Sequence, residues 1–244
     1  MTEKTNDQTA RRLPIKGLQK TSLLDFPPHT SAIVFVGGCN FRCPYCHNPE
    51  LVLASSDAKE IDEEEVIDFL VDRKEWIDAV VVTGGEPTLY PDLKRFIRRL
   101  KELKLKVKLD TNGTNPKLMW DMLEEKLLDY IAMDIKAPLE LYESHVMMPV
   151  DTGNIKKSIA LIMNSGIDYE FRTTVLPKMI DKEIFDKMVR LAKGAKRFVI
   201  QQYRKEAGVL DEGFLKDAKS FSKEELMDLK KAAEPYFDIV DIRD

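Results

Sequence analysis

The sequence has few cysteines, no long apolar run and little excess charge, and each of these absences removes a class of protein. Three cysteines in 244 residues, clustered at positions 39–46, do not make the disulfide framework of a small secreted protein. No apolar run approaches the roughly 18 residues of a membrane span, and the polar start "MTEKTNDQTARR" lacks a signal-peptide core. The net charge of −4 gives no pull toward nucleic acid or an anionic membrane. We therefore expect a cytoplasmic protein with neither as a partner.

Short apolar runs alternate with amphipathic stretches along the chain. Near-continuous apolar strands are typical of parallel strands buried on both faces, and right-handed crossovers place the helices outside. Six such units predict an α/β fold, a partial (β/α)6 TIM-like barrel. No linker interrupts the pattern, so we expect a disordered tail over residues 1–12 and a single domain over 13–244. The predicted strands are 31–36, 79–84, 106–111, 130–135, 169–175 and 197–202, with 237–242 as an edge strand; the predicted helices are 62–76, 91–104, 116–127, 154–165, 181–193 and 222–235.

Polar segments stand at the carboxyl end of every predicted strand of the six units. Chemistry in such folds sits beyond these strand ends, so the sequence predicts one shared site. The segments are the three cysteines, "GGEP" (84–87), "DTNG" (110–113), "DIKAP" (134–138), "RTT" (172–174) and "QQYR" (201–204).

The stretch "GGCNFRCPYCHNPEL" holds all three cysteines and admits several interpretations. "CPYC" has the form of a glutaredoxin dithiol, but Pro49 opposes a helix starting at that dithiol. "CPYCH" fits covalent haem attachment, although no export signal accompanies it. Zinc would need a fourth ligand such as His47, which would have to fold back. Three thiolates without a fourth suit a [4Fe–4S] cluster with one iron left open, which is the interpretation we favour among these four.

The cysteine spacing C-x3-C-x2-C, with Tyr45 before the last cysteine, resembles the signature of the radical SAM superfamily, and "GGEP" resembles its second motif. The resemblance covers nearly the whole chain. It implies that Cys39, Cys43 and Cys46 are the catalytic residues and metal ligands that hold a [4Fe–4S] cluster. It also implies that S-adenosylmethionine binds the open iron and is cleaved by one electron to methionine and a 5′-deoxyadenosyl radical.

The resemblance also implies cofactor-binding residues, and each has a plainer structural alternative. Gly84, Gly85 and Glu86 are expected to hold the methionyl amino group, where the alternative is an ordinary turn. Tyr45 is expected to lie against the adenine, and Thr111 or Asn112 near the ribose or carboxylate. Asp134 and Lys136 alternate about one residue, which predicts a shared inward face and contact with the cofactor; the alternative is a structural ion pair. Arg172, with Thr174 on its face, and Gln202 are further cofactor or substrate contacts.

The segments "GLQKTSLLDFP", "DIKAP" and "SGIDYEFRTTVLP" resemble glycyl-radical-enzyme activating proteins, above all the anaerobic ribonucleoside-triphosphate reductase activators, with pyruvate formate-lyase activators next. The implied reaction abstracts a glycine Cα hydrogen from a partner glycyl-radical enzyme, with ferredoxin or flavodoxin as electron donor. The alternative function is modification of a small molecule or RNA base, as in deazaguanine-forming enzymes. For the basic stretch 93–108 we favour a solvated helix over a docking patch. The sequence assigns no role to His47 or His145.

Overall fold

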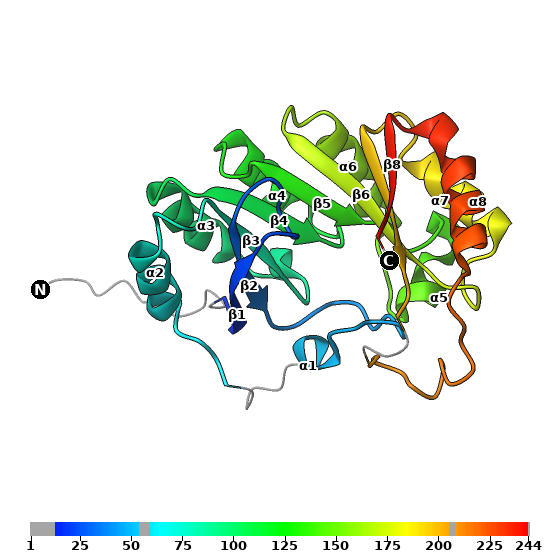
Figure 1. Ribbon diagram of the computed structural model, residues 1–244, viewed down its shortest axis with the longest axis horizontal. Helices are drawn as coiled ribbons and strands as arrows, with labels where there is room; N and C mark the ends of the chain where they lie inside the picture. Colours follow the sequence, from blue (N-terminus) through cyan, green and yellow to red (C-terminus); the bar gives the residue numbers. More distant parts are fainter. Residues whose placement is uncertain (1–12, 54–58, 205–207, 244) are drawn as a thin grey trace, which may run out of the picture.

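The computed structural model describes residues 13–53, 59–204 and 208–243, and the expected tail at 1–12 lies outside them. One eight-stranded sheet runs through these residues in chain order, with β1 antiparallel to β2 and every later pair parallel (Figure 1). Within the described residues β1 and β8 do not pair, so the sheet is an open, partial barrel. The strands are β1 (Ile15–Ser22), β2 (Ser31–Val36), β3 (Ala79–Gly84), β4 (Lys106–Thr111), β5 (Tyr130–Asp134), β6 (Asp168–Val175), β7 (Arg197–Gln202) and β8 (Ile239–Arg243).

The predicted α/β partial barrel is confirmed, and so is the edge strand, β8. The antiparallel strand β1 is not among the predicted strands. Its sequence, "IKGLQKTS", contains a glycine and four polar residues in a row, and its pairing with β2 shifts register twice. A strand of this kind has neither the apolar run nor the strict alternation that identifies a strand from sequence.

All the predicted helices except α6 are shorter than their amphipathic stretches, and side-chain caps mark where most helices begin. Asp62, Asn115 and Asp181 each accept a hydrogen bond from the first turn of the predicted helix that follows. Asp151 caps α6 in the same way, and Ser222 forms a capping box with Glu225. The helices are α1 (Pro49–Val52), α2 (Glu63–Asp72), α3 (Leu93–Glu102), α4 (Pro116–Glu124), α5 (Tyr142–Val146), α6 (Thr152–Met163), α7 (Lys182–Leu191) and α8 (Lys223–Ala233), with 3-10 turns η1 (Pro87–Leu89), η2 (Leu139–Leu141) and η4 (Glu234–Tyr236).

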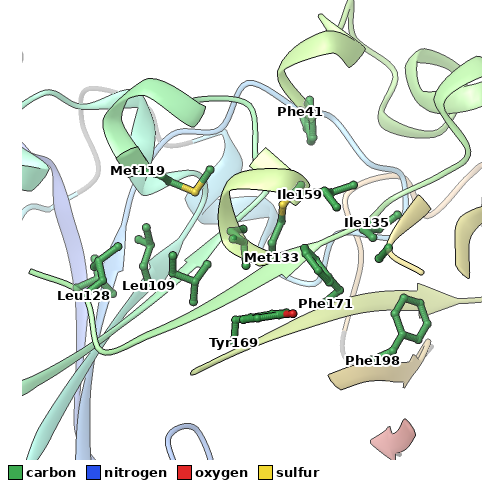
Figure 2. Packing of buried hydrophobic residues seen from close by; sticks show 14 of the residues in the cluster. Phe41, Leu109, Met119, Leu128, Met133, Ile135, Ile159, Tyr169, Phe171 and Phe198 are labelled. Atoms are coloured by element: carbon green, nitrogen blue, oxygen red, sulfur yellow. The ribbon is translucent and has the colours of Figure 1, made fainter. Parts of the chain in front are cut away.

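Both faces of the central strands are buried, as parallel strands of this composition require. Alternate residues of β2 belong to different clusters: Val34 and Val36 join the large core, while Ile33 packs with Phe26 and Val81 in a smaller one. Figure 2 shows part of the large core, including Met119, Ile159, Met133 and Phe171. No helix in the described part of the chain is long and apolar enough to span a membrane.

The basic helix α3 carries charges that neighbouring helices neutralise. Arg99 pairs with both Glu63 and Glu64 of α2, at 2.6 and 2.7 Å. On its other side Lys94 and Arg98 pair with Glu125, at 2.5 and 2.7 Å. Ion pairs to adjacent elements account for these positive charges. They fit the solvated-helix interpretation and leave little free charge for an acidic docking partner.

Candidate active site

A cavity of about 420 Å³ lies at the carboxyl ends of the parallel strands. Its walls come from the loop after β2 and from the ends of β3 to β8, so the polar segments predicted to share a site do meet. Among the predicted site residues only Glu86 does not line it. The lining residues are Cys39, Phe41, Cys43, Tyr45, Cys46, His47, Asn48, Val52, Thr83, Gly84, Gly85, Asp110, Thr111, Asn112, Asp134, Lys136, Arg172, Thr174, Gln201, Gln202, Arg204 and Arg243.

The cysteine loop is held in place by backbone contacts on both sides and by one arginine. The Arg42 guanidinium donates to the carbonyl oxygens of Cys39 and Phe41, both at 2.7 Å. The Arg42 amide donates to the Val146 carbonyl of α5, and the Leu210 amide donates to that of Cys46. These contacts fix the loop that presents the thiols. Arg42 is missed by the sequence analysis because a charged residue between cysteines gives no signal of its own.

The three cysteines are free thiols, and the surroundings of Cys39 and Cys43 favour the uncharged form until a positive group binds. Burial raises the pKa of Cys39 to about 12 and that of Cys43 to about 11. Within the described residues no three His, Cys, Asp or Glu side chains converge as ligands of one metal ion. Three thiols facing one cavity fit a larger iron–sulfur cluster, whose positive irons stabilise thiolates.

Two glycines allow the end of β3 to pack directly on the backbone that leads into the cysteine loop. A Cβ on Gly84 would lie 2.2 Å from the Val36 carbonyl oxygen, and one on Gly85 would lie 1.9 Å from that of Gly38. The Glu86 amide then donates to the Gly38 carbonyl at 2.8 Å. The glycines therefore permit an approach between two protein backbones, and the turn and the cysteine loop form one packed unit.

Gly85→Ala should lower the free energy of unfolding by about 1–3 kcal/mol, because the added methyl has to displace backbone atoms. Gly213→Ala is the matched control, since neither glycine has a positive φ and the nearest atom to the Gly213 Cβ position is a side-chain oxygen at 3.4 Å. Urea unfolding of the two variants measures the difference. Equal stability would show that the turn relaxes freely.

Glu86 is fully buried and is not among the residues that line the cavity, so the expected direct contact of its carboxylate with an ammonium group stays a prediction. Burial raises its pKa while hydrogen bonds oppose that shift. Its oxygens accept from the backbone amide and hydroxyl of Thr88, from the Thr111 hydroxyl at 2.8 Å and from the backbone amide of Asn112 at 2.6 Å. With these donors Glu86 fixes the loop after β4 in position.

Asn112 connects that loop to the cysteine loop. The side-chain amide of Asn112 donates to Asn40 Oδ1 at 2.8 Å, and the side-chain amide of Asn40 donates to the Thr114 hydroxyl at 3.0 Å. The Thr114 hydroxyl in turn donates to Asn112 Oδ1 at 2.7 Å, which closes a ring of three side chains. Asn40 is missed by the sequence analysis, and its signal would have been an amide side chain beside the first cysteine.

A chain of buried charges crosses the cavity wall from β4 to the residues after β5. Arg172 on β6 donates to Asp110 at 3.0 Å and to Asp134 at 2.9 Å, and Lys136 lies 3.2 Å from Asp134. Burial raises the pKa of Asp134, but the two cations outweigh it and hold that pKa at about 2. Asp134 and Lys136 thus share one face, as their alternation predicts. The pKa values of Asp110 and Asp134 are both lowered, so both carboxylates are ionised.

Three polar atoms in this wall are buried without a hydrogen-bond partner among the described residues. They are the Tyr45 hydroxyl, His47 Nε2 and Asp110 Oδ1. Each belongs to a residue that lines the cavity. Burial lowers the pKa of His47, so its ring is held neutral. Unsatisfied buried polar atoms are costly, and here they suit a polar group bound in the cavity.

Gln202 and His145 are both engaged in structural contacts. The Gln202 amide donates to the Phe221 carbonyl at 2.6 Å and accepts from the Phe221 amide at 3.3 Å, so its polar atoms hold a distant segment. Gln202 still lines the cavity, and the expected cofactor contact by Gln202 stays a prediction. The His145 ring lies between the carbonyl oxygens of Leu141 and Met179, each at 3.0 Å, outside the cavity lining.

Known proteins resemble this chain in sequence and in fold. The Radical SAM superfamily model matches residues 33–192. A Methanocaldococcus jannaschii protein, provisionally named a glycyl-radical enzyme activating enzyme, is 35% identical over 94% of this chain and 95% of its own length. The Staphylococcus aureus pyruvate formate-lyase-activating enzyme is 35% identical over 45% of this chain and 47% of its own. Streptococcus suis SuiB bound to S-adenosylmethionine shares the fold, with a TM-score of 0.65 at 17% identity, over 85% of this chain and 48% of that one.

Proposed function

The chain belongs to the radical SAM superfamily, and we propose that it activates a glycyl-radical enzyme by abstracting a glycine Cα hydrogen. The observation that carries this proposal is the likeness, over nearly the full length of both chains, to a protein named as such an activating enzyme. Enzymes of this superfamily use a [4Fe–4S] cluster and S-adenosylmethionine. A ferredoxin or flavodoxin is the proposed electron donor.

Cys39, Cys43 and Cys46 are the residues we propose to hold the cluster, because they are the only cysteines and share one cavity. When bound, the reduced cluster supplies an electron that cleaves S-adenosylmethionine and yields the radical that takes the substrate hydrogen. The protein's part is to present three thiols, to exclude water and to fix the charges around them. Arg42 and the glycine packing of β3 on the cysteine loop keep those thiols in place.

The buried charged side chains of Asp110, Asp134, Lys136 and Arg172 match the charged groups of a zwitterionic cofactor. Lys136 offers an ammonium to a carboxylate or ribose hydroxyl, and Asp134 and Asp110 offer acceptors. Arg172 holds both carboxylates ionised and oriented. Tyr45 and its unpartnered hydroxyl lie within the cluster loop, where an aromatic face suits an adenine. Glu86 acts through Thr111 and Asn112 as a positioning residue.

Lys136→Ala should weaken S-adenosylmethionine binding by roughly 10- to 100-fold, the value of one lost charge-assisted hydrogen bond. The cluster should be retained, because Lys136 is not among the thiols. Isothermal titration of the reconstituted protein measures the affinity, and iron content checks the cluster. Lys117→Ala is the control, since Lys117 is an exposed lysine of α4 paired only with Asp121. Unchanged affinity would leave Lys136 a structural partner of Asp134.

The activating function is tested by mixing the reduced protein anaerobically with S-adenosylmethionine and a glycyl-radical enzyme. An organic radical signal split into a doublet by the remaining glycine α-hydrogen is expected. Deuterated glycine in the partner should collapse the doublet and place deuterium in the 5′-deoxyadenosine. Failure with a panel of such enzymes, together with hydrogen loss from a small molecule or RNA base, would replace this function with the alternative one.

A further inference from the structure

Three polar side chains form a row across the last three strands of the sheet. Thr174 on β6 is in register with Gln201 on β7, which is in register with Arg243 on β8. All three line the cavity. This set of three residues, named the 174–201–243 row, lies on the last three strands in the strand order, whereas the cysteines lie on the loop that follows β2.

The members of the row differ in whether they already have partners. Neither the Thr174 hydroxyl nor the Gln201 amide makes a side-chain hydrogen bond within the described part of the chain, although both face the cavity. Arg243 is held by a two-pronged ion pair to Glu170, at 2.8 and 2.6 Å, and Glu170 is only 1% exposed. This bidentate ion pair, the fork between Arg243 and Glu170, fixes β8 against β6 and keeps Arg243 in place. Two uncommitted polar groups therefore stand beside an anchored cation.

The row is chemically different from the charged wall on β4 to β6. A hydroxyl and a primary amide each offer a donor and an acceptor without charge. The backbone of a peptide also offers one N–H and one C=O per residue. The ionic groups of S-adenosylmethionine are matched by Asp110, Asp134 and Lys136, whereas the uncharged members of the row suit peptide groups. The row therefore offers groups that match a peptide backbone, and the cofactor-affinity measurement described below separates this from contact with the ribose hydroxyls of S-adenosylmethionine.

From this difference we infer that the 174–201–243 row binds the backbone of the extended substrate segment that carries the reacting glycine. The inference rests on the proposed function and names the residues that position its protein substrate. The row covers two strand spacings, roughly 10 Å, which is about three residues of extended chain. That is the length of a glycine with its two neighbours. Backbone recognition also requires no particular side chain on the substrate, which suits a residue that has none.

Two adjacent threonines make the test specific. Thr174→Val removes the hydroxyl that faces the cavity at nearly constant shape. Thr173→Val makes the same change one residue earlier, at a side chain that is fully buried, outside the cavity lining and without a hydrogen-bond partner in the described residues. Gln201→Ala removes the amide. The readouts are the KM for the partner glycyl-radical enzyme, the affinity for S-adenosylmethionine and the rate of its cleavage without partner.

Thr174→Val should raise the KM for the partner about 5-fold and Gln201→Ala about 10-fold, as expected for one or two lost hydrogen bonds. Partner-free cleavage, cofactor affinity and the Thr173→Val protein should match the wild type. Unchanged KM in both cavity variants would overturn the inference, and so would an equal loss of cofactor affinity, which would assign the row to S-adenosylmethionine. A wild-type protein that cleaves S-adenosylmethionine yet forms no glycyl radical would instead overturn the proposed function, and this inference with it.

Discussion

Replacing any one of Cys39, Cys43 or Cys46 with alanine should reduce the iron bound after anaerobic reconstitution from about four per chain to nearly none. The chain has no other cysteine to take the place of the missing thiol. Two remaining thiols supply one ligand fewer than the three on which the proposed cluster depends, so they cannot hold it. Iron analysis and the brown absorbance of the reconstituted protein measure the loss, and cleavage of S-adenosylmethionine should disappear with it.

His47→Ala separates the cluster from a zinc site. A zinc ion held by three cysteines and His47 would lose affinity when the imidazole is removed, whereas a three-thiolate cluster should keep its iron. The His47 ring lies beside Tyr203 in the cavity wall, with ring centroids 5.8 Å apart. Zinc at one per chain that survives chelation, with no iron taken up, would refute the cluster assignment.

Arg172→Met should lower the free energy of unfolding by about 3–5 kcal/mol at pH 7, the usual cost of stranding a buried charge. Arg172 is the guanidinium between Asp110 and Asp134, and it is itself only 9% exposed. Methionine fills the space without supplying the positive charge. Urea unfolding at pH 7 measures the change, with Arg190→Met as the control because that arginine forms an exposed pair with Asp186 on α7.

The pH dependence of this variant has a definite sign. In the wild type the pKa of Asp134 is held at about 2, below its value of about 3.9 in an unfolded chain. The ionised carboxylate therefore contributes stability above pH 4, and this contribution is lost as the pH falls through 2. Without Arg172, burial is less opposed and the pKa rises, so protonation in mild acid relieves the stranded charge. The stability gap between variant and wild type should narrow from pH 7 to pH 5, and a constant gap would contradict the argument.

The parallel strands of the barrel could be predicted because their burial on both faces leaves apolar runs in the sequence. The runs at 31–36, 79–84, 106–111 and 197–202 match β2, β3, β4 and β7 in both bounds. The predicted ends of the helices were less accurate than those of the strands. A helix stops where its backbone hydrogen bonds end, whereas the apolar stripe in the sequence continues past that point. The strand β1 and the short helices α1 and α5 could not be predicted, since their place depends on what they pack against.

The candidate site could be predicted at the level of which segments meet, because parallel strands bring their carboxyl ends together. Which atoms face the cavity could not be predicted. Glu86 and Gln202 are polar residues in the right segments, yet their oxygens and nitrogens bind other parts of the chain. Gln201, beside Gln202, also lines the cavity, and its side-chain amide makes no hydrogen bond within the described residues. Arg243 lies one residue past the predicted edge strand, so its role in the wall was not anticipated.

The strand order of the sheet also bears on how this protein assembles. Every strand pairs with its neighbour in the chain, so each pairing closes only one loop of moderate length and the sheet can grow one unit at a time. The cavity, by contrast, draws its walls from Cys39 through to Arg243. A nascent chain that has formed β1 to β6 would already present its thiols, while the fork between Arg243 and Glu170 would still be missing. The ability to bind the cofactor should therefore appear later than the secondary structure during synthesis. An emerging chain would expose its thiols before the residues that surround the cavity are all in place.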